Sequence, residues 1–249
     1  MTKPTVIAED LLKFIDLTSL NDEDTNESIL QFLSYSHCKY GHVAAVCVYS
    51  KFIHVVLDYI NLHKLPINLA TVVNFPKGDL DILKVKYDII DAINAGANEI
   101  DIVMPYKELM VGNQKAVQDL ISMARETCGD RVLKVIIESG ELDSNNLIKL
   151  ASEICLENEV DFIKTSTGKT AIGATLEAAT TILNTIKDSG SNCGFKVSGG
   201  VSSIEVATHY AQLVEKILGE AALTPKRFRI GTSKLVKAIL GDAISGEGY

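Results

Sequence analysis

The chain has 249 residues, of which 47% are apolar and 22% are charged, and its net charge is −8. This composition predicts a globular chain with a full apolar core rather than a disordered one. The acidic balance argues against a nucleic-acid partner, because an acidic surface gains no attraction to a phosphate polymer. It does not exclude a small phosphorylated ligand, which a few lysines and backbone N–H groups suffice to bind.

The cysteines and the N-terminal residues bear on the cellular compartment. Five cysteines occur without a C-x-x-C pair, a pattern that indicates neither a disulfide framework nor a zinc site and fits a reducing compartment. The first residues lack the apolar stretch and the cleavage site of a signal peptide. No apolar run approaches the roughly 18 residues that a membrane span needs. We therefore expect a cytoplasmic protein without a membrane partner.

Short apolar segments alternate with longer amphipathic segments along the chain. The expected strands are residues 14–17, 43–48, 69–74, 99–104, 132–138, 161–165, 194–198 and 227–231, of which the first and last have the weakest pattern. Most are almost continuously apolar, as parallel strands that are buried on both faces must be. Apolar residues at helical spacing predict helices between them, over residues 79–95, 112–128, 143–158, 175–189 and 202–218.

Eight units of strand and helix, each of roughly 30 residues, predict an α/β fold in the form of a single (β/α)8 TIM barrel. No linker rich in Pro, Gly or Ser divides the chain, so residues 1–249 are expected to form one domain with a flexible C-terminal tail at about 242–249. The alternative is an open doubly wound sheet. Such a sheet usually carries a G-x-G-x-x-G dinucleotide motif, which is absent from this sequence.

Charged residues occur within the predicted strands or at their ends. Lys164 lies in DFIKTSTGK, Lys196 in GFKVSGGV and Asp101 in EIDIVMPY, while Asp16 and Glu138 are expected to end their strands. Barrel enzymes form their active sites at the carboxyl ends of the strands. A lysine or aspartate buried there must be paired or functional, so these residues are candidates for catalysis.

Two neighbouring lysines beside an aspartate suit Schiff-base chemistry. One ammonium raises the cost of charging the other, so a neutral amine becomes available to attack a carbonyl near neutral pH. The protonated imine withdraws electrons from the adjacent carbon–carbon bond, and the aspartate relays protons. A single strand lysine is more often part of a structural ion pair, which is the interpretation favoured for Lys134. Lys164 and Lys196 together favour catalysis.

Three loops rich in glycine and hydroxyl groups follow the last three predicted strands. Glycines let backbone N–H groups approach an anion closely, and such loops form the phosphate site of many barrels. Each loop alone is weak evidence, since Gly-Gly and Gly-Thr-Ser are also common turns and helix caps. The candidate phosphate-binding residues are Thr167, Gly168, Lys169, Gly199, Gly200, Gly231, Thr232 and Ser233.

The cysteine and histidine patterns do not indicate another chemistry. Cys47 is expected to lie near the end of its strand, either as a pocket residue or as a small buried hydrophobic residue. The five histidines are scattered, and no H-x-x-x-H motif or carboxylate cluster indicates a metal site. We therefore expect an enzyme that uses no metal and no cofactor.

These motifs resemble those of the deoxyribose-phosphate aldolase family. The resemblance includes the segments around Lys164, Lys196 and Asp101, together with LxxFIDLTSLND at 11–22, AAVCVY at 44–49 and RIGTS at 229–233. It extends from about Leu11 to Tyr249. It implies a (β/α)8 barrel that reversibly cleaves 2-deoxy-D-ribose 5-phosphate to D-glyceraldehyde 3-phosphate and acetaldehyde, so a small phosphorylated sugar is the expected partner.

The resemblance also implies roles for individual residues. Lys164 forms the imine, and Asp101 and Lys196 tune it and relay protons. The three glycine-rich loops surround the phosphate. The other residues implied in substrate binding are Asp16, Thr18 and Cys47 in the sugar pocket and Tyr249, which reaches the site from the C-terminal tail unless that tail is simply a free end.

The chain departs from the usual family pattern at three places. Val197-Ser198 replaces Pro-Ala or Ala-Ser, Ser202 stands where an arginine is common, and Lys234 stands where a serine is frequent. The last two changes redistribute positive charge around the phosphate pocket. Two alternatives stay open: another Schiff-base aldolase with a different phosphorylated sugar as substrate, and a non-catalytic phosphate-binding barrel. A homodimer is plausible for such a barrel, although no surface stripe identifies an interface.

Overall fold

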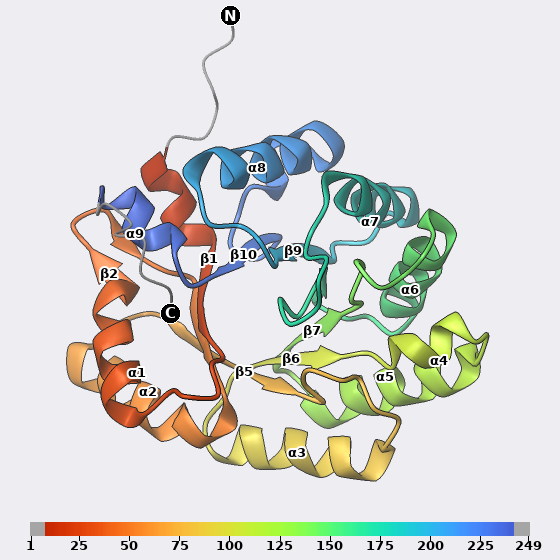
Figure 1. Cartoon of the computed structure of the whole chain (residues 1–249), viewed down its shortest axis with the longest axis horizontal. Coiled ribbons are helices and arrows are strands. Elements are labelled where there is room, and N and C mark those ends of the chain that lie inside the picture. The colour runs from red at the N-terminus through yellow and green to blue at the C-terminus, as the bar shows by residue number, and fades with distance from the viewer. Residues whose placement is uncertain (1–7, 242–249) are drawn as a thin grey trace, which may run out of the picture.

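Eight parallel strands form a closed barrel in the computed structural model, which describes residues 8–241 (Figure 1). Around the barrel they are β1 (Ile15–Ser19), β4 (Ala45–Val48), β5 (Asn68–Val73), β6 (Glu99–Val103), β7 (Val132–Ile136), β8 (Phe162–Lys164), β9 (Gly194–Ser198) and β10 (Phe228–Thr232). The parallel pairing of β10 with β1 closes the ring. The predicted (β/α)8 TIM barrel is confirmed, and the open doubly wound sheet is excluded.

Helices surround the barrel on its outer side (Figure 1). They are α1 (Asn26–Leu33), α2 (Ile53–His63), α3 (Ile82–Asn94), α4 (Tyr106–Met110), α5 (Gln114–Cys128), α6 (Asn145–Glu157), α7 (Leu176–Ser189), α8 (Ile204–Leu218) and α9 (Leu235–Ile239). Short 3-10 helices occur at Ala8–Phe14, Ser34–Ser36, Ser50–Phe52 and Glu220–Ala222. The small strands β2 (His37–Cys38) and β3 (Gly41–His42) pair with each other outside the barrel.

Side-chain caps and left-handed residues determine where the elements begin and end. The helix predicted from residue 79 begins at Ile82, because the Asp81 side chain accepts a hydrogen bond from the backbone N–H of Lys84 and caps the helix there. The strand predicted over 132–138 ends at Ile136, since Glu138 has a φ of 50° that an extended strand cannot continue.

Alternate residues of each strand pack in two different environments. Ile100, Ile163 and Phe195 are fully buried in the apolar core that also includes residues of the surrounding helices. Their strand neighbours Asp101 and Lys164 face the other way, into the barrel, because successive side chains of a strand point to opposite faces. The apolar core therefore lies between strands and helices, and the barrel interior is free to hold polar groups.

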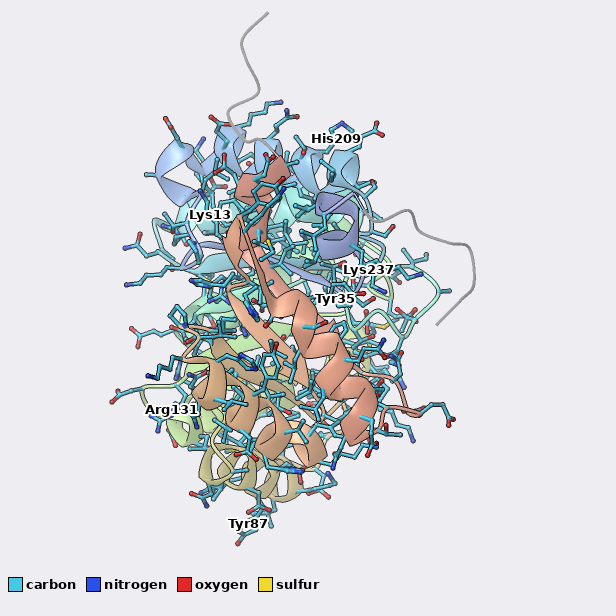
Figure 2. All side chains as sticks on the ribbon, turned by 90° about the vertical axis from the view of Figure 1, so that its left-hand side faces the viewer. Lys13, Tyr35, Tyr87, Arg131, His209 and Lys237 are labelled. Carbon is cyan, nitrogen blue, oxygen red and sulfur yellow. The ribbon has the colours of Figure 1, made fainter. Side chains whose placement is uncertain are left out.

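The C-terminal helix α9 packs beside the first 3-10 helix, Ala8–Phe14. The ammonium nitrogen of Lys237 lies 4.8 Å from the centroid of the Tyr35 ring, and the two side chains are adjacent in Figure 2. No helix within residues 8–241 is long and apolar enough to cross a membrane. The predicted tail at 242–249 lies outside the described residues.

Gly194 is required by the close approach of a neighbouring strand. A Cβ atom at this position would overlap the ring of Phe162 on β8. We expect Gly194→Ala to lower the free energy of unfolding by about 1–3 kcal/mol, the usual cost of overpacking a core. Urea unfolding measures this change. The penalty should shrink in a Phe162→Leu background, and an equal penalty in both backgrounds would contradict the overlap as its cause.

Candidate active site

The register of the barrel brings the candidate residues from separate strands together. Lys164 on β8 pairs with Lys196 on β9, and Lys196 pairs with Arg229 on β10. On the other side, Asp101 on β6 pairs with Lys134 on β7. Cα partners in neighbouring strands point their side chains to the same face, so all five side chains point into the barrel.

Lys164 and Lys196 share one oxygen of a buried aspartate. The Nζ atom of Lys164 lies 2.8 Å from Oδ2 of Asp101, and the Nζ atom of Lys196 lies 2.7 Å from the same oxygen. Lys196 also lies 2.6 Å from Oδ2 of Asp16. The two lysines and the aspartate that the sequence analysis selected thus form one directly bonded group.

Lys134 occupies the other oxygen of Asp101. Its Nζ atom lies 2.8 Å from Oδ1 of Asp101 and 2.5 Å from Oε2 of Glu99. The interpretation of Lys134 as part of an ion pair is confirmed. As a consequence, both oxygens of Asp101 are already neutralised by cations other than Lys164.

The surroundings of the two central lysines have opposite effects on their pKa values. Burial lowers the pKa of Lys164; Asp101 opposes this, and the charge of Lys196 adds to it. Burial also disfavours the charged form of Lys196, but Asp101 and Asp16 outweigh it and raise its pKa. Lys164 is therefore the lysine that most easily becomes a neutral amine, while Lys196 stays an ammonium.

The carboxyl group of Asp101 stays ionised inside the barrel. Burial alone would raise its pKa, but Lys134, Lys164 and Lys196 outweigh burial and hold the pKa well below its usual range. The carboxylate can therefore accept a proton from a reacting group only transiently, and it holds the two lysines in place at other times.

A cavity of about 410 Å³ opens above Lys164. Its wall combines the last residues of β1, β8, β9 and β10 with residues of the loops that follow them, at the carboxyl ends of these strands, where barrel enzymes form their sites. The predicted site residues that line it are Thr18, Lys164, Thr167, Gly168, Lys169, Gly199, Gly200, Gly231, Thr232 and Ser233.

Four predicted site residues within the described part of the chain do not line this cavity: Asp16, Asp101, Lys196 and Cys47. Asp16, Asp101 and Lys196 are fully buried among the ion pairs within the barrel. Asp16 does not end its strand as expected: β1 continues to Ser19, so Asp16 lies deeper in the barrel than a strand end would. Tyr249 lies outside the described residues.

Cys47 is the fourth of these residues, and it is fully buried. It belongs to a small apolar cluster with Leu20, Ala45, Ala70 and Val72. Burial raises the pKa of its thiol to about 11. Cys47 is therefore a neutral, apolar neighbour of the charged group. Among residues 8–241, no three His, Cys, Asp or Glu side chains gather in a way that could hold a metal ion.

Two of the three departures from the family pattern place a side chain of altered charge in the lining of this cavity. Ser202 and Lys234 both belong to its lining, as do Asn21 and Ser198. Lys234 therefore supplies a positive charge to the cavity in which Ser202 stands where an arginine is common in the family. Asn21 and Ser198 were not among the predicted site residues, although both lie within the motifs quoted from the sequence.

A family model described as DeoC/LacD family aldolase matches residues 11–223 of the chain. The chain belongs to this family. It is 40% identical to a deoxyribose-phosphate aldolase of Agrobacterium fabrum over 99% of this chain and 95% of that protein.

Among solved structures, a tetrameric deoxyribose phosphate aldolase of Aeropyrum pernix is 25% identical, with a TM-score of 0.76, covering 94% of this chain and 92% of that one. The aldolase QR15 is 27% identical, with a TM-score of 0.80, covering 93% and 95%.

Glu138 holds the loop of this aldolase-family chain that follows Lys164. Its carboxylate accepts hydrogen bonds from the Thr167 hydroxyl at 2.5 Å, from the Thr167 backbone N–H at 3.2 Å and from the Thr170 hydroxyl at 3.3 Å. Burial raises the pKa of this carboxyl group. The Thr167 hydroxyl is therefore engaged within the protein, and the loop is held next to the cavity by one carboxylate.

Glycine at position 231 makes room for Lys196. A Cβ atom there would lie 2.8 Å from the Cβ of Ser198 and 3.2 Å from the Cε of Lys196. From the sequence, Gly231 was predicted only as a phosphate-binding residue. Its position shows a second requirement, since a larger residue would overlap Ser198 and crowd the lysine that shares Asp101 with Lys164.

We expect Glu138→Gln to weaken substrate binding more than turnover. An amide accepts fewer hydrogen bonds than a carboxylate, and loss of charged hydrogen bonds costs about 1.5–3 kcal/mol, so KM should rise by about tenfold or more. Steady-state kinetics with 2-deoxyribose 5-phosphate measures the change. Glu141→Gln on the same segment is the matched control. An unchanged KM for Glu138→Gln would contradict the role of Glu138 in holding the loop.

Proposed function

We propose that the protein is a class I aldolase that reversibly cleaves 2-deoxy-D-ribose 5-phosphate to D-glyceraldehyde 3-phosphate and acetaldehyde through an imine on Lys164. The supporting observation is the buried Lys164 on the cavity wall, whose pKa is lowered while the pKa of its neighbour Lys196 is raised. Family membership supports the reaction class, and the name of the Agrobacterium fabrum relative supports the substrate.

The chemistry follows from a neutral amine beside a retained ammonium and a carboxylate. The amine of Lys164 attacks the C1 aldehyde of the open-chain sugar, and loss of water gives the protonated imine. Removal of the proton from the C3 hydroxyl then breaks the C2–C3 bond, whose electrons move into the imine and form an enamine. Glyceraldehyde 3-phosphate leaves. Protonation of the enamine at C2 and hydrolysis release acetaldehyde and restore Lys164.

Asp101 is placed to carry protons for these steps, and Lys196 is placed to tune it. Both lie within hydrogen-bond distance of Lys164 or of its partner oxygen, as acid–base groups must. In the proposed mechanism Lys196 keeps its proton and stabilises the carboxylate, while Asp101 exchanges protons with the reacting centre. The amine of Lys164 stays available because burial and the charge of Lys196 outweigh the stabilisation of its ammonium form by Asp101.

The glycine-rich loops are the proposed phosphate site. Gly199 and Gly200 have φ values of 86° and 91°, which glycine adopts without strain, and both line the cavity with Lys169 and Lys234. Backbone N–H groups and two ammonium groups can therefore surround an anion there. Asp16, Thr18 and Cys47 stay proposed neighbours of the sugar, and Tyr249 stays a proposed group from the tail.

The cellular setting belongs to the same proposal. An enzyme of this specificity would act in the breakdown of deoxyribonucleotides and sugars. All five cysteines are free, which supports the cytoplasmic location expected from their spacing. The homodimer also stays a prediction.

Borohydride reduction in the presence of 2-deoxyribose 5-phosphate tests the imine directly. We expect a reduced adduct on the peptide that contains Lys164, detected by mass spectrometry, with the mass of either the sugar phosphate or acetaldehyde. Lys164→Met should abolish the adduct, whereas Lys187→Met on the outer helix α7 should leave it intact. If ligand binds but no lysine is modified, the Schiff-base mechanism is wrong and a phosphate-binding barrel is favoured.

Replacement of Lys196 tests the coupling of the two lysines. Lys196→Leu removes a positive charge next to Lys164 and should raise the pKa of Lys164. Because the reactive amine is the deprotonated form, activity is lost as the pH falls through this pKa. The acid limb of the plot of kcat/KM against pH should therefore move to higher pH, and activity near neutral pH should fall. An unchanged pH profile would contradict the coupling.

A further inference from the structure

The charged side chains next to Lys164 form a closed ring. Going round it, a carboxylate alternates with a cation at every step, and each neighbouring pair is in ion-pair contact. The members are Asp101, Lys196, Asp16, Arg229, Glu99 and Lys134. The first three links are 2.7 Å from Asp101 to Lys196, 2.6 Å from Lys196 to Asp16 and 2.6 Å from Asp16 to Arg229.

The ring continues through Glu99 and returns to Asp101. Arg229 lies 3.0 Å from Glu99, Glu99 lies 2.5 Å from Lys134, and Lys134 lies 2.8 Å from Asp101. None of the six side chains is more than 5% exposed. Arg229 is held further by a hydrogen bond to the backbone oxygen of Pro225 and by the ring of Phe162, 5.4 Å from its guanidinium carbon.

The ring is electrically balanced without Lys164. It contains three cations and three carboxylates. Lys196 and Arg229 each contact two carboxylates, and Lys134 contacts all three, since it also lies 3.5 Å from Oδ2 of Asp16. Lys164 contacts Asp101 alone among the carboxylates of the described residues, so its ammonium would be a fourth cation beside three carboxylates. In a buried group of charges, the side chain whose charge is least well compensated is the one that most easily becomes neutral. Here that side chain is Lys164, which becomes neutral by losing a proton.

We propose that Arg229 and Glu99, on the far side of this ring from Lys164, are positioning residues that set the protonation state of Lys164 through the ring. The inference rests on the proposed function, in which Lys164 is the nucleophile. Neither residue contacts Lys164 or lines the cavity above it. Their effect on Lys164 is indirect. They pair with Asp16 and Lys134, which in turn contact Lys196 and Asp101, so that every charge of the ring has a partner of opposite sign.

The charge balance gives each residue an effect of definite sign. Without Arg229, three cations including Lys164 face three carboxylates. The ammonium of Lys164 is then compensated, so its pKa rises. Without the Glu99 carboxylate, four cations face two carboxylates. The excess of positive charge grows, so the pKa of Lys164 falls further.

The other strands add no further charge next to Lys164. The ring supplies the charged groups of β1, β6, β7, β9 and β10. From β4 the titratable neighbour is Cys47, whose pKa of about 11 keeps it a neutral thiol. From β5 the neutral Asn68 side chain donates a hydrogen bond to Oε1 of Glu99 at 2.8 Å.

The test measures the pKa of Lys164 without substrate, by NMR titration of protein labelled with 13C-lysine and assigned with Lys164→Met. We expect Arg229→Met to raise this pKa and Glu99→Gln to lower it, each by about one pH unit or more. The double variant restores an excess of one cation, so its pKa should return toward the wild-type value. In active variants, the acid limb of kcat/KM should move in the same direction as the pKa.

Two controls separate charge from geometry. Arg229→Lys keeps a cation between Asp16 and Glu99 and should leave the pKa of Lys164 near the wild-type value. Arg125→Met removes a guanidinium that pairs with Asp161 at 2.7 Å on the outside of the barrel, and it should leave the pKa unchanged. Circular dichroism checks each fold. If Arg229→Met does not fold, Glu99→Gln and Arg229→Lys still test the sign and the charge dependence.

The inference is overturned if Glu99→Gln and Arg229→Met leave the pKa of Lys164 unchanged, or if both move it in the same direction. The proposed function fails by a different result. A wild-type protein that neither cleaves 2-deoxyribose 5-phosphate nor forms a borohydride adduct would refute the aldolase, whatever the NMR titration gives. An active enzyme whose Lys164 pKa ignores Arg229 and Glu99 would refute only the role of the ring.

Discussion

The ion pairing inside the barrel is the constraint on which the rest of the structure depends. Seven ionisable side chains are buried there, and breaking one buried pair typically costs about 3–5 kcal/mol. They can remain only because the strand register sets cations and carboxylates side by side, and because an apolar layer between strands and helices supplies the hydrophobic stabilisation. The barrel is stable around a charged interior because that interior is almost completely paired.

The proposed chemistry occurs at Lys164, the buried lysine whose ion pairing is incomplete. Asp101 is shared by three lysines, and Lys164 is the one without a second carboxylate. The same lysine meets the cavity, while the other two are sealed within the barrel. The carboxylate of Asp101 therefore has two effects. It holds Lys134 and Lys196 in place, and because it is shared with them it does not fully compensate the charge of Lys164. The loops that line the cavity are the proposed phosphate site, and Glu138 holds the loop that follows Lys164.

The sequence was a good guide wherever a local pattern was strong. Continuous apolar strands predicted the barrel, and β9 has the expected limits. Local backbone chemistry changed other limits, as at Glu138, whose left-handed conformation ends the strand early. The first βα units were least predictable, since α2 begins with Ile, Val and Leu residues that suit a strand as well as a helix. The depth of Asp16 was misjudged because the weak strand around it continues further than its pattern indicated.

The sequence by itself determined the fold class, the family and the residue types of the site, because these depend on periodicity and on motifs a few residues long. Only the tertiary structure decided which lysine is undercompensated. The ring joins residues far apart in the chain, and its longest link, from Asp16 to Arg229, spans 213 positions. A pKa depends on the distances to all charges around a group and on its burial, and neither can be deduced from neighbours in sequence. For that reason Arg229 and Glu99 received no role from the sequence, although both lie in quoted motifs, and only the tertiary structure places them in the ring.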